Sequence, residues 1–355
     1  MKIALLTIWH CGNYGAEMQA YATYKALISL GHQVKMLDFP LDANNNLSFK
    51  IRLANCIGNF TPANHKFNAF WSKYIPSISR TYQSVDELRK DPPQADMYLV
   101  GSDQVWNPDI TRDKAAAFFL DFGPENVRRA SFSSSFGVSV WDGASPLTAI
   151  AKKRLLSFSG ISCREQSGLD ILKKEFNIDQ AELTLDPTLL HSDYSELTGP
   201  LVEKPTLAFY PLSSKDYALE TFCREIAKSH NMDLINANPY SYLLGTGIVW
   251  NRNSLAQWLK TIAEAQFVIT PSFHGLVFSL IHHRQFAILY LAKHGRQSRI
   301  TGLLEQLGLS DRYFNNMDTL RHSNVFQRPI DYELIDKKLE VLRNNSWNYL
   351  RTITK

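Results

Sequence analysis

Short apolar runs alternate with stretches of helical periodicity along most of the chain. Apolar runs at 3–8, 33–38 and 95–100 have the length of buried strands, and a helical stretch at about 17–30 separates the first two. This alternation predicts parallel βαβ units. Further along the chain we expect strands at 129–137, 160–163, 206–210, 232–235, 266–269 and 285–291, and helices at about 145–158, 216–230, 254–265 and 332–350.

The pattern restarts after a segment that resembles a linker. Gly199-Pro200 and Lys204-Pro205 fall within residues 191–205, where turn residues are frequent. We therefore predict an α/β protein of two doubly wound Rossmann-like domains that face a cleft. The expected domains are 1–190 and 191–331, and a C-terminal helix within 332–355 packs back on the first domain.

Residues 41–95 are harder to interpret because they mix asparagines with basic and aromatic side chains. One interpretation is an ordinary insertion whose helices pack on the domain. The other is a lid or a membrane-facing element, since basic and aromatic helices can lie on lipid. The first interpretation is favoured because no clear amphipathic pattern is present.

Composition excludes several classes of protein. The net charge is +4 over 355 residues, without a dense basic block that would indicate nucleic-acid binding. The four cysteines lie far apart, which is typical of a reducing cytosol. The chain shows no signal peptide, no transmembrane run and no metal-ligand spacing. We expect a cytoplasmic protein that needs no cofactor or metal, and its charge is compatible with contact at the inner membrane.

One polar turn between two apolar runs is a candidate site. Ser272-Phe273-His274-Gly275 follows the apolar run 267–269 and precedes another at 276–281. This predicts a strand, a turn and a helix, with His274 at the helix N-terminus and at the carboxyl end of the strand. Ligands bind at that edge of open α/β sheets, and helix N-termini favour anions. Ser272 and Gly275 would add a hydroxyl and an approachable backbone, although a histidine that only caps the turn is the alternative.

The loop after the first strand carries Asn13 and Gly15. Both are candidates for contact with a ligand, and a simple tight turn is the alternative. The loop contains neither a GxGxxG sequence nor a P-loop lysine, so a dinucleotide or nucleoside triphosphate site is disfavoured.

A second polar loop follows the strand at 95–100. Asp103 could act as a general base, Gln104 and Asn107 could bind hydroxyls, and Trp106 could stack on the apolar face of a sugar. In the alternative interpretation Asp103 caps a helix and Trp106 lies in the core.

Two cations follow predicted strands at the same edge. Arg164 comes after the strand at 160–163, and a planar guanidinium suits carboxylate or phosphate; an ion pair with Glu165 or Asp186 is the alternative. Lys293 follows the strand at 285–291 and could neutralise a phosphate as a point charge.

These segments together resemble the polysaccharide pyruvyl transferase family. The matching residues, in family order, are Gly12-Asn13-Tyr14-Gly15-Ala16 with Gln19, Gly101-Ser102-Asp103-Gln104-Val105-Trp106-Asn107, Ser162-Cys163-Arg164-Glu165, Leu185-Asp186-Pro187-Thr188 and Ser272-Phe273-His274-Gly275. The resemblance implies a fold like that of GT-B glycosyltransferases. It also implies transfer of the enolpyruvyl group of phosphoenolpyruvate to a sugar diol, giving a pyruvate ketal and phosphate.

The resemblance suggests roles for the candidate residues. His274 would be the proton donor, and Arg164, Lys293, Ser272 and Gly275 would bind the donor. Asp103 is our hypothesis for the base. The acceptor would lie against the first domain, near Asn13, Gly15, Gln104, Trp106 and Asn107. A lipid-linked repeat unit of a bacterial polysaccharide is the implied acceptor, but the sequence does not identify its sugar, its hydroxyls or the ketal stereochemistry.

Two other functions are compatible with the same pattern. One is a nucleotide-sugar glycosyltransferase of similar shape. It is disfavoured because the second half of the chain lacks an evident acidic pair near His274. The other is a glycan-binding subunit without activity, which the joint presence of His274, Arg164 and Asp103 disfavours.

Overall fold

The computed structural model describes residues 1–41, 61–143, 145–211, 216–242, 249–291 and 297–355. The chain divides into two compact units. The first unit comprises Met1–Asn44, Ser72–His191 and Leu339–Lys355, and the second comprises Asn45–Trp71 and Ser192–Lys338.

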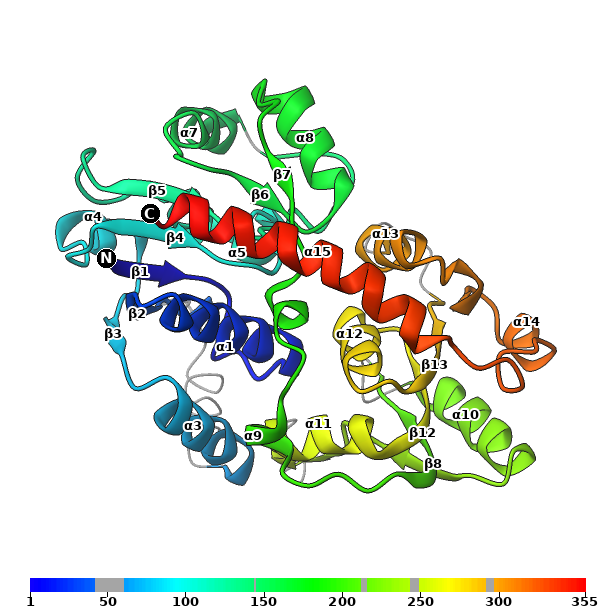
Figure 1. The fold of residues 1–355 in the computed structure, drawn as a ribbon. Helices are drawn as coiled ribbons and strands as arrows, with labels where there is room; N and C mark the ends of the chain where they lie inside the picture. Colours follow the sequence, from blue (N-terminus) through cyan, green and yellow to red (C-terminus); the bar gives the residue numbers. More distant parts are fainter. Residues whose placement is uncertain (42–60, 144, 212–215, 243–248, 292–296) are drawn as a thin grey trace. The chain divides into compact units, whose positions relative to one another are not determined.

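The first unit is built on a five-stranded parallel sheet with the order β3-β2-β1-β4-β5 (Figure 1). Its strands are β1 (Lys2–Leu6), β2 (Gln33–Asp38), β3 (Ile78–Thr81), β4 (Met97–Val100) and β5 (Arg128–Ser131). A short parallel pair, β6 (Ser162–Cys163) and β7 (Glu182–Leu183), continues beside β5 through isolated bridges.

Helices and short 3₁₀ turns connect these strands. They are α1 (Tyr14–Ser29), α4 (Val85–Lys90), α5 (Pro108–Thr111), η1 (Arg112–Lys114), α6 (Ala115–Phe118), α7 (Ser145–Leu155), α8 (Gln166–Phe176) and η2 (Pro187–Leu190). The C-terminal helix α15 (Tyr332–Ile353) ends in this unit, where Ser346 Oγ accepts a hydrogen bond from Leu185 N and Tyr349 donates one to the Ser131 carbonyl.

The second unit has its own five-stranded parallel sheet, in the order β14-β13-β12-β8-β9. Its strands are β8 (Lys204–Phe209), β9 (Asp233–Asn236), β12 (Ala265–Thr270), β13 (Gln285–Leu289) and β14 (Tyr313–Phe314), and a separate antiparallel pair is formed by β10 (Tyr240–Tyr242) and β11 (Val249–Arg252). Its helices are α3 (Pro62–Tyr74, whose last residues belong to the first unit), α9 (Ser195–Thr198), α10 (Tyr217–Ser229), α11 (Leu255–Glu264), α12 (Phe273–Ile281), α13 (Ser298–Leu307), η3 (Ser310–Arg312) and α14 (Met317–Arg321).

Most predicted elements form, and the expected α/β class with two Rossmann-like sheets is confirmed. The differences arise at element ends. Helix α1 begins at Tyr14 rather than near residue 17, because the Asn13 side chain caps it. The strand expected at 129–137 ends at Ser131, and Ser133 adopts a positive φ of 54°. The expected linker at 191–205 contains α9 and the start of β8.

The described part of residues 41–95 supports the interpretation as a packed insertion. On α3, Phe67, Phe70 and Trp71 are all buried, so these rings are not available to a lipid surface. The remainder of the proposed lid, residues 42–60, lies outside the described residues. Among the helices that the structure describes, none is long and apolar enough to cross a bilayer.

Candidate active site

In the first sheet, β2 and β3 follow β1 on one side, and β4 and β5 lie on its other side. The strand order therefore reverses between β1 and β4, which are neighbours in the sheet. Such a switch point, at the carboxyl ends of the strands, is where open α/β sheets bind ligands. The loops that follow the two strands meet here, because Thr7 Oγ1 donates a hydrogen bond of 2.7 Å to the Ser102 carbonyl. Gln19 of α1 secures this contact with a hydrogen bond of 3.1 Å to Thr7 Oγ1.

Asn13 and Gly15, predicted to contact the acceptor, form the turn into α1. The Asn13 Oδ1 atom accepts hydrogen bonds from the backbone N–H groups of Gly15 (2.9 Å) and Ala16 (3.2 Å). This helix cap is the local role that the tight-turn alternative anticipated. Gly15 is buried, so its backbone lies away from solvent.

Glu17 holds the rest of this loop, although no sequence motif singles it out. Its carboxylate accepts backbone N–H hydrogen bonds from His10 (3.0 Å), Cys11 (3.0 Å) and Gly12 (2.9 Å). Burial raises the pKa of Glu17 above its ordinary value, although these hydrogen bonds act in the opposite direction. The loop amides that could have bound an external anion are therefore occupied by the protein's own carboxylate.

Arg164 lies in a buried ion cluster at the same switch point. Its Nη1 atom lies 2.6 Å from Asp186 Oδ2, its Nη2 atom 2.9 Å from Asp103 Oδ1 and its Nε atom 3.7 Å from Glu165 Oε2. Burial lowers the pKa of Arg164, but the three carboxylates more than reverse this and hold its pKa above the ordinary value. The side chain is 0% exposed and makes the ion pairs that the alternative interpretation described, while its contact with the donor stays a prediction.

Asp103 is the member of this cluster that reaches solvent. Its side chain is 16% exposed, against 0% for Asp186 and 2% for Glu165. The backbone of Asp103 has a φ of 72°, the left-handed region that aspartate tolerates better than most residues. An unusual backbone conformation of this kind is frequent at functional sites. Asp103 is thus an oriented carboxylate at the carboxyl edge of the sheet.

Three neighbours of Asp103 that we expected to bind the acceptor have structural roles. Trp106 is 0% exposed, stacks on Phe119 and donates its indole N–H to the Phe118 carbonyl, as the core alternative anticipated. Asn107 is buried and caps α5, and its side-chain amide donates to Gln104 Oε1. The side chain of Gln104 lies against Gly137, so close that a Cβ atom there would be 2.1 Å from Gln104 Oε1.

The second sheet has the equivalent switch point between β8 and β12. After β12 the chain turns at Pro271, and α12 begins at Phe273 with Ser272 as its N-cap. His274 is therefore the second residue of α12, at the carboxyl edge of the sheet, as the sequence predicted. Its side chain is largely buried, and its ring packs edge-on against Phe273 at 5.3 Å between centroids.

Neutral groups hold this turn. Thr270 Oγ1 donates to the Tyr210 carbonyl (2.8 Å) and accepts from Ser272 N (3.0 Å), and Ser272 Oγ accepts from Gly275 N (3.3 Å). A Cβ atom at Gly275 would lie 2.6 Å from Thr270, so close packing explains this glycine. Ser272 and Gly275, predicted to bind the donor, act in the cap that orients α12.

One described cation lies close to the start of α12. The Arg299 guanidinium of α13 is 5.6 Å from the centroid of the Phe273 ring. The first turn of α12 contains no acidic residue, whereas that of α1 contains Glu17. Lys293, the other cation predicted here, lies outside the described residues.

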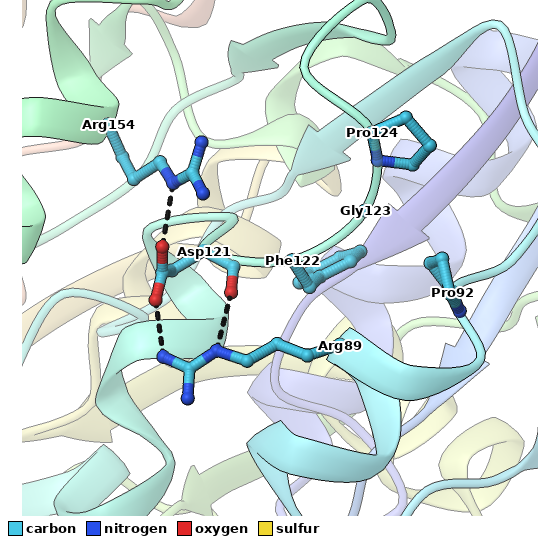
Figure 2. A pocket seen from close by; sticks show the side chains of 7 residues that line it. All are labelled: Arg89, Pro92, Asp121, Phe122, Gly123, Pro124 and Arg154. Atoms are coloured by element: carbon cyan, nitrogen blue, oxygen red, sulfur yellow. Dashed lines mark hydrogen bonds and ion pairs between the residues drawn. The ribbon is translucent and has the colours of Figure 1, made fainter.

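A pocket of about 320 Å³ lies away from these loops, lined by residues that precede β4 and β5 and by Arg154 of α7. Figure 2 shows Arg89 and Arg154 both bound to the carboxylate of Asp121. Arg154 also pairs with Glu125, which the figure does not draw. Burial favours a higher pKa for Asp121, but the two arginines hold it below its ordinary value. Carboxylates thus neutralise both guanidinium groups, which makes this pocket a poor anion site. Among the residues described, no group of three acidic, histidine or cysteine side chains could hold a metal.

Solved structures of UDP-N-acetylglucosamine 2-epimerases share this fold. The enzyme of Neisseria meningitidis bound to UDP-GlcNAc gives a TM-score of 0.53 at 8% identity, covering 100% of this chain and 99% of that one. The enzyme of Methanocaldococcus jannaschii gives 0.53 at 10% identity over 96% and 93%, and a putative enzyme of Listeria monocytogenes gives 0.51 at 11% identity over 96% and 90%. At this identity the likeness shows a GT-B-like fold and says nothing of the reaction.

No curated protein matches the sequence. A family model for polysaccharide pyruvyl transferase matches residues 13–292. This range contains both switch-point loops, with Asp103 in one and His274 in the other, and it covers most of the chain. The chain therefore belongs to the polysaccharide pyruvyl transferase family, a family of transferase enzymes.

Proposed function

We propose that this chain forms a pyruvate ketal on a sugar, with phosphoenolpyruvate as the donor. A proton adds to the methylene carbon of phosphoenolpyruvate, and the neighbouring carbon becomes cationic. One sugar hydroxyl attacks that carbon and loses its proton, and the bond to the phosphate oxygen breaks. A second hydroxyl of the same sugar then attacks the same carbon, loses its proton and closes the ring. The two hydroxyls lose two protons in all: one balances the proton added to carbon, and the other is taken up by the phosphate, which leaves as hydrogen phosphate.

The placement of His274 carries this proposal. It combines a side chain suited to proton transfer near neutral pH with the N-terminus of a helix, which attracts anions. Phosphoenolpyruvate is an anion that must receive a proton, so both features match the donor. The negative charge of a bound donor would also stabilise the imidazolium that delivers the proton.

Asp103 is our candidate for the base that accepts a proton from a sugar hydroxyl. Its carboxylate is partly exposed at the switch point of the first sheet, and the ion pair with Arg164 fixes its orientation. A base must be oriented toward the proton it takes, and this carboxylate meets that requirement within its own unit.

The charges of the donor would be met in the second unit. Arg299 and the N-terminus of α12 are the described groups that favour an anion there, and Lys293 remains a candidate from the sequence. We do not include Arg164 among these groups, because its guanidinium is fully buried among carboxylates.

The acceptor we propose is a sugar diol in a polysaccharide precursor, as the family implies. A lipid-linked repeat unit modified in the cytoplasm, at the face of the inner membrane, is the form we favour. The comparison to make is between a water-soluble oligosaccharide and the same oligosaccharide on a lipid carrier in vesicles. A lower KM with unchanged kcat for the lipid-borne form would support this choice.

The experiment that tests the donor is thermal unfolding with phosphoenolpyruvate, UDP-GlcNAc or buffer alone. A ligand at 100 times its Kd stabilises the folded protein by about 2.7 kcal/mol. We expect stabilisation by phosphoenolpyruvate and none by UDP-GlcNAc. Phosphate release with a panel of methyl hexopyranosides, and the mass of the ketal product, would then identify the reaction.

A nucleotide-sugar reaction is the second candidate, because the solved epimerases of the same fold were crystallised with UDP-GlcNAc or UDP. Stabilisation by UDP-GlcNAc, with release of UDP and no response to phosphoenolpyruvate, would favour it over our proposal. Binding of glycan without either reaction would instead indicate a non-catalytic subunit.

A further inference from the structure

The ion cluster around Arg164 contains more negative than positive charge. Three carboxylates, those of Asp103, Asp186 and Glu165, surround one guanidinium and come from three separate loops of the first unit. If all are ionised, the cluster carries two surplus negative charges. A buried surplus of this kind favours the uptake of a proton, because like charges at short range in a low dielectric repel strongly.

Asp186 is held as a carboxylate more firmly than Asp103. Its Oδ1 atom accepts from Thr188 N (3.1 Å) and Thr188 Oγ1 (2.6 Å), and its Oδ2 atom accepts from Ser102 Oγ (3.1 Å) and Arg164 Nη1 (2.6 Å). Hydrogen bonds to a charged carboxylate keep it charged. Glu165 accepts from Phe136 N and is almost fully buried. Asp103 is the carboxylate of the three with access to solvent, and hence to protons.

We infer that Asp186 is a positioning residue that, with Glu165, makes Asp103 a stronger base by competing for Arg164. Arg164 fixes Oδ1 of Asp103 at 2.9 Å, while the two buried carboxylates offset the positive charge that would otherwise weaken its attraction for a proton. The role of Asp103 as the base rests on the proposed function; the electrostatic coupling within the cluster does not.

The signs of the effects follow from the charges. Asp186→Asn removes a negative charge, which leaves Arg164 to Asp103 and lowers the pKa of Asp103. Glu165→Gln acts in the same direction with a smaller effect, because Glu165 lies farther from the guanidinium. Arg164→Gln removes the positive charge and raises the pKa of Asp103. If Asp186 only supported the local structure, Asp186→Asn and Arg164→Gln would not be expected to shift the pKa of Asp103 in opposite directions.

The test is a pH titration of the Asp103 carboxyl by NMR in the full-length protein, labelled with ¹³C at the aspartate carboxyl carbon. Asp103→Asn assigns the signal. We expect the Asp103 midpoint to fall by about one pH unit in Asp186→Asn and to rise by at least as much in Arg164→Gln. Asp179→Asn is the matched control, since it removes an exposed charge of the same unit, and it should move the midpoint by less than about 0.2 units.

An unchanged or higher Asp103 midpoint in Asp186→Asn would overturn the inference. If Asp186→Asn does not fold, an unchanged or higher Asp103 midpoint in Glu165→Gln would overturn the inference. The titration needs no substrate, so its outcome is independent of the donor. Absence of phosphate release in the wild-type protein would instead contradict the proposed function. Where activity is present, the acid limb of the kcat/KM profile should shift in the same direction as the NMR midpoint.

Discussion

The two units place the same topological feature in different chemical surroundings. In the first unit, the switch point between β1 and β4 is ionic: Glu17 occupies the loop amides, and Arg164 is shared among carboxylates. In the second unit, the switch point between β8 and β12 is held by Thr270, Ser272 and backbone groups. Two units of the same topology thus present different groups at this edge: the first presents an oriented carboxylate, and the second presents a histidine at a helix N-terminus without an acidic residue in its first turn.

The largest expected effect comes from His274, which defines the second switch point. General acid catalysis contributes about 100- to 10,000-fold, so His274→Ala should lower kcat/KM for phosphate release by at least 100-fold. His283→Gln is the control, because His283 is an exposed histidine just after the same helix. A residual rate of His274→Ala within about tenfold of wild type would rule out the proton-donor role.

The next effect concerns the ionic loop of the first unit. Glu17→Ala leaves three partly buried backbone N–H groups without their carboxylate acceptor. Water can reach them in part, so each should cost less than the roughly 1–3 kcal/mol of a fully buried unsatisfied group. We expect the free energy of unfolding to fall by about 2–4 kcal/mol in urea titrations. The matched change in the second unit, Ser272→Ala, removes a neutral helix cap and should cost about 1 kcal/mol. Equal losses in the two variants would argue against the contrast between an ionic and a neutral turn.

A glycine of the neutral turn, Gly275, can be compared with a glycine of α13, Gly302. Gly275→Ala places a Cβ atom 2.6 Å from Thr270, and such overpacking costs about 1–3 kcal/mol. Gly302→Ala in α13 meets nothing within 4 Å and should stabilise the protein by about 0.5–1 kcal/mol, because alanine is the better helix former. Thermal unfolding of both variants checks the opposite signs, and a neutral Gly275→Ala would contradict the close packing.

The last effect is on stability, and it depends on pH through His282 of the second unit. Burial, with Arg284 and His283 nearby, lowers the pKa of His282 to about 4 from an ordinary 6.5. The folded state thus disfavours the charged ring, and the contribution of His282 to stability is complete above pH 6.5 and is lost as pH falls toward 4. The full loss is about 3 kcal/mol, because each pKa unit between 6.5 and about 4 corresponds to about 1.4 kcal/mol. Urea unfolding at pH 7 and pH 4.5 should show that the free energy of unfolding falls less at the lower pH in His282→Gln than in wild type. An equal fall in the two proteins would exclude His282 as the cause.

Local patterns predicted the framework of both units well. The strand at 33–38 forms with its expected bounds, and α11 begins one residue from the expected position because Ser254 and Gln257 make a capping box. His274 is also where the sequence placed it, since an apolar run, a turn and a helix are local features. Short-range patterning is enough for such elements.

The candidate site was harder to predict because distant residues decide where side chains point. Arg164 follows a strand at the expected edge, but carboxylates at positions 103 and 186, far away in sequence, hold it inside the unit. Trp106 lies in a polar loop, yet Phe119 and Phe136 draw its ring into the core. Glu17 carried no signal beyond an acidic residue in the first turn of a helix, a common and locally favourable feature.

The proposal that the second unit binds the donor can be tested by calorimetric titration of phosphoenolpyruvate. The titration compares wild type with Arg299→Gln of the second unit, Asp103→Asn of the first, and Arg321→Gln as an exposed control. We predict that phosphoenolpyruvate binds wild type, that binding weakens at least tenfold, or about 1.4 kcal/mol, in Arg299→Gln, and that it stays within about twofold in Asp103→Asn and Arg321→Gln. Weakened binding in Asp103→Asn with no change in Arg299→Gln would place the donor at the first unit and contradict the account.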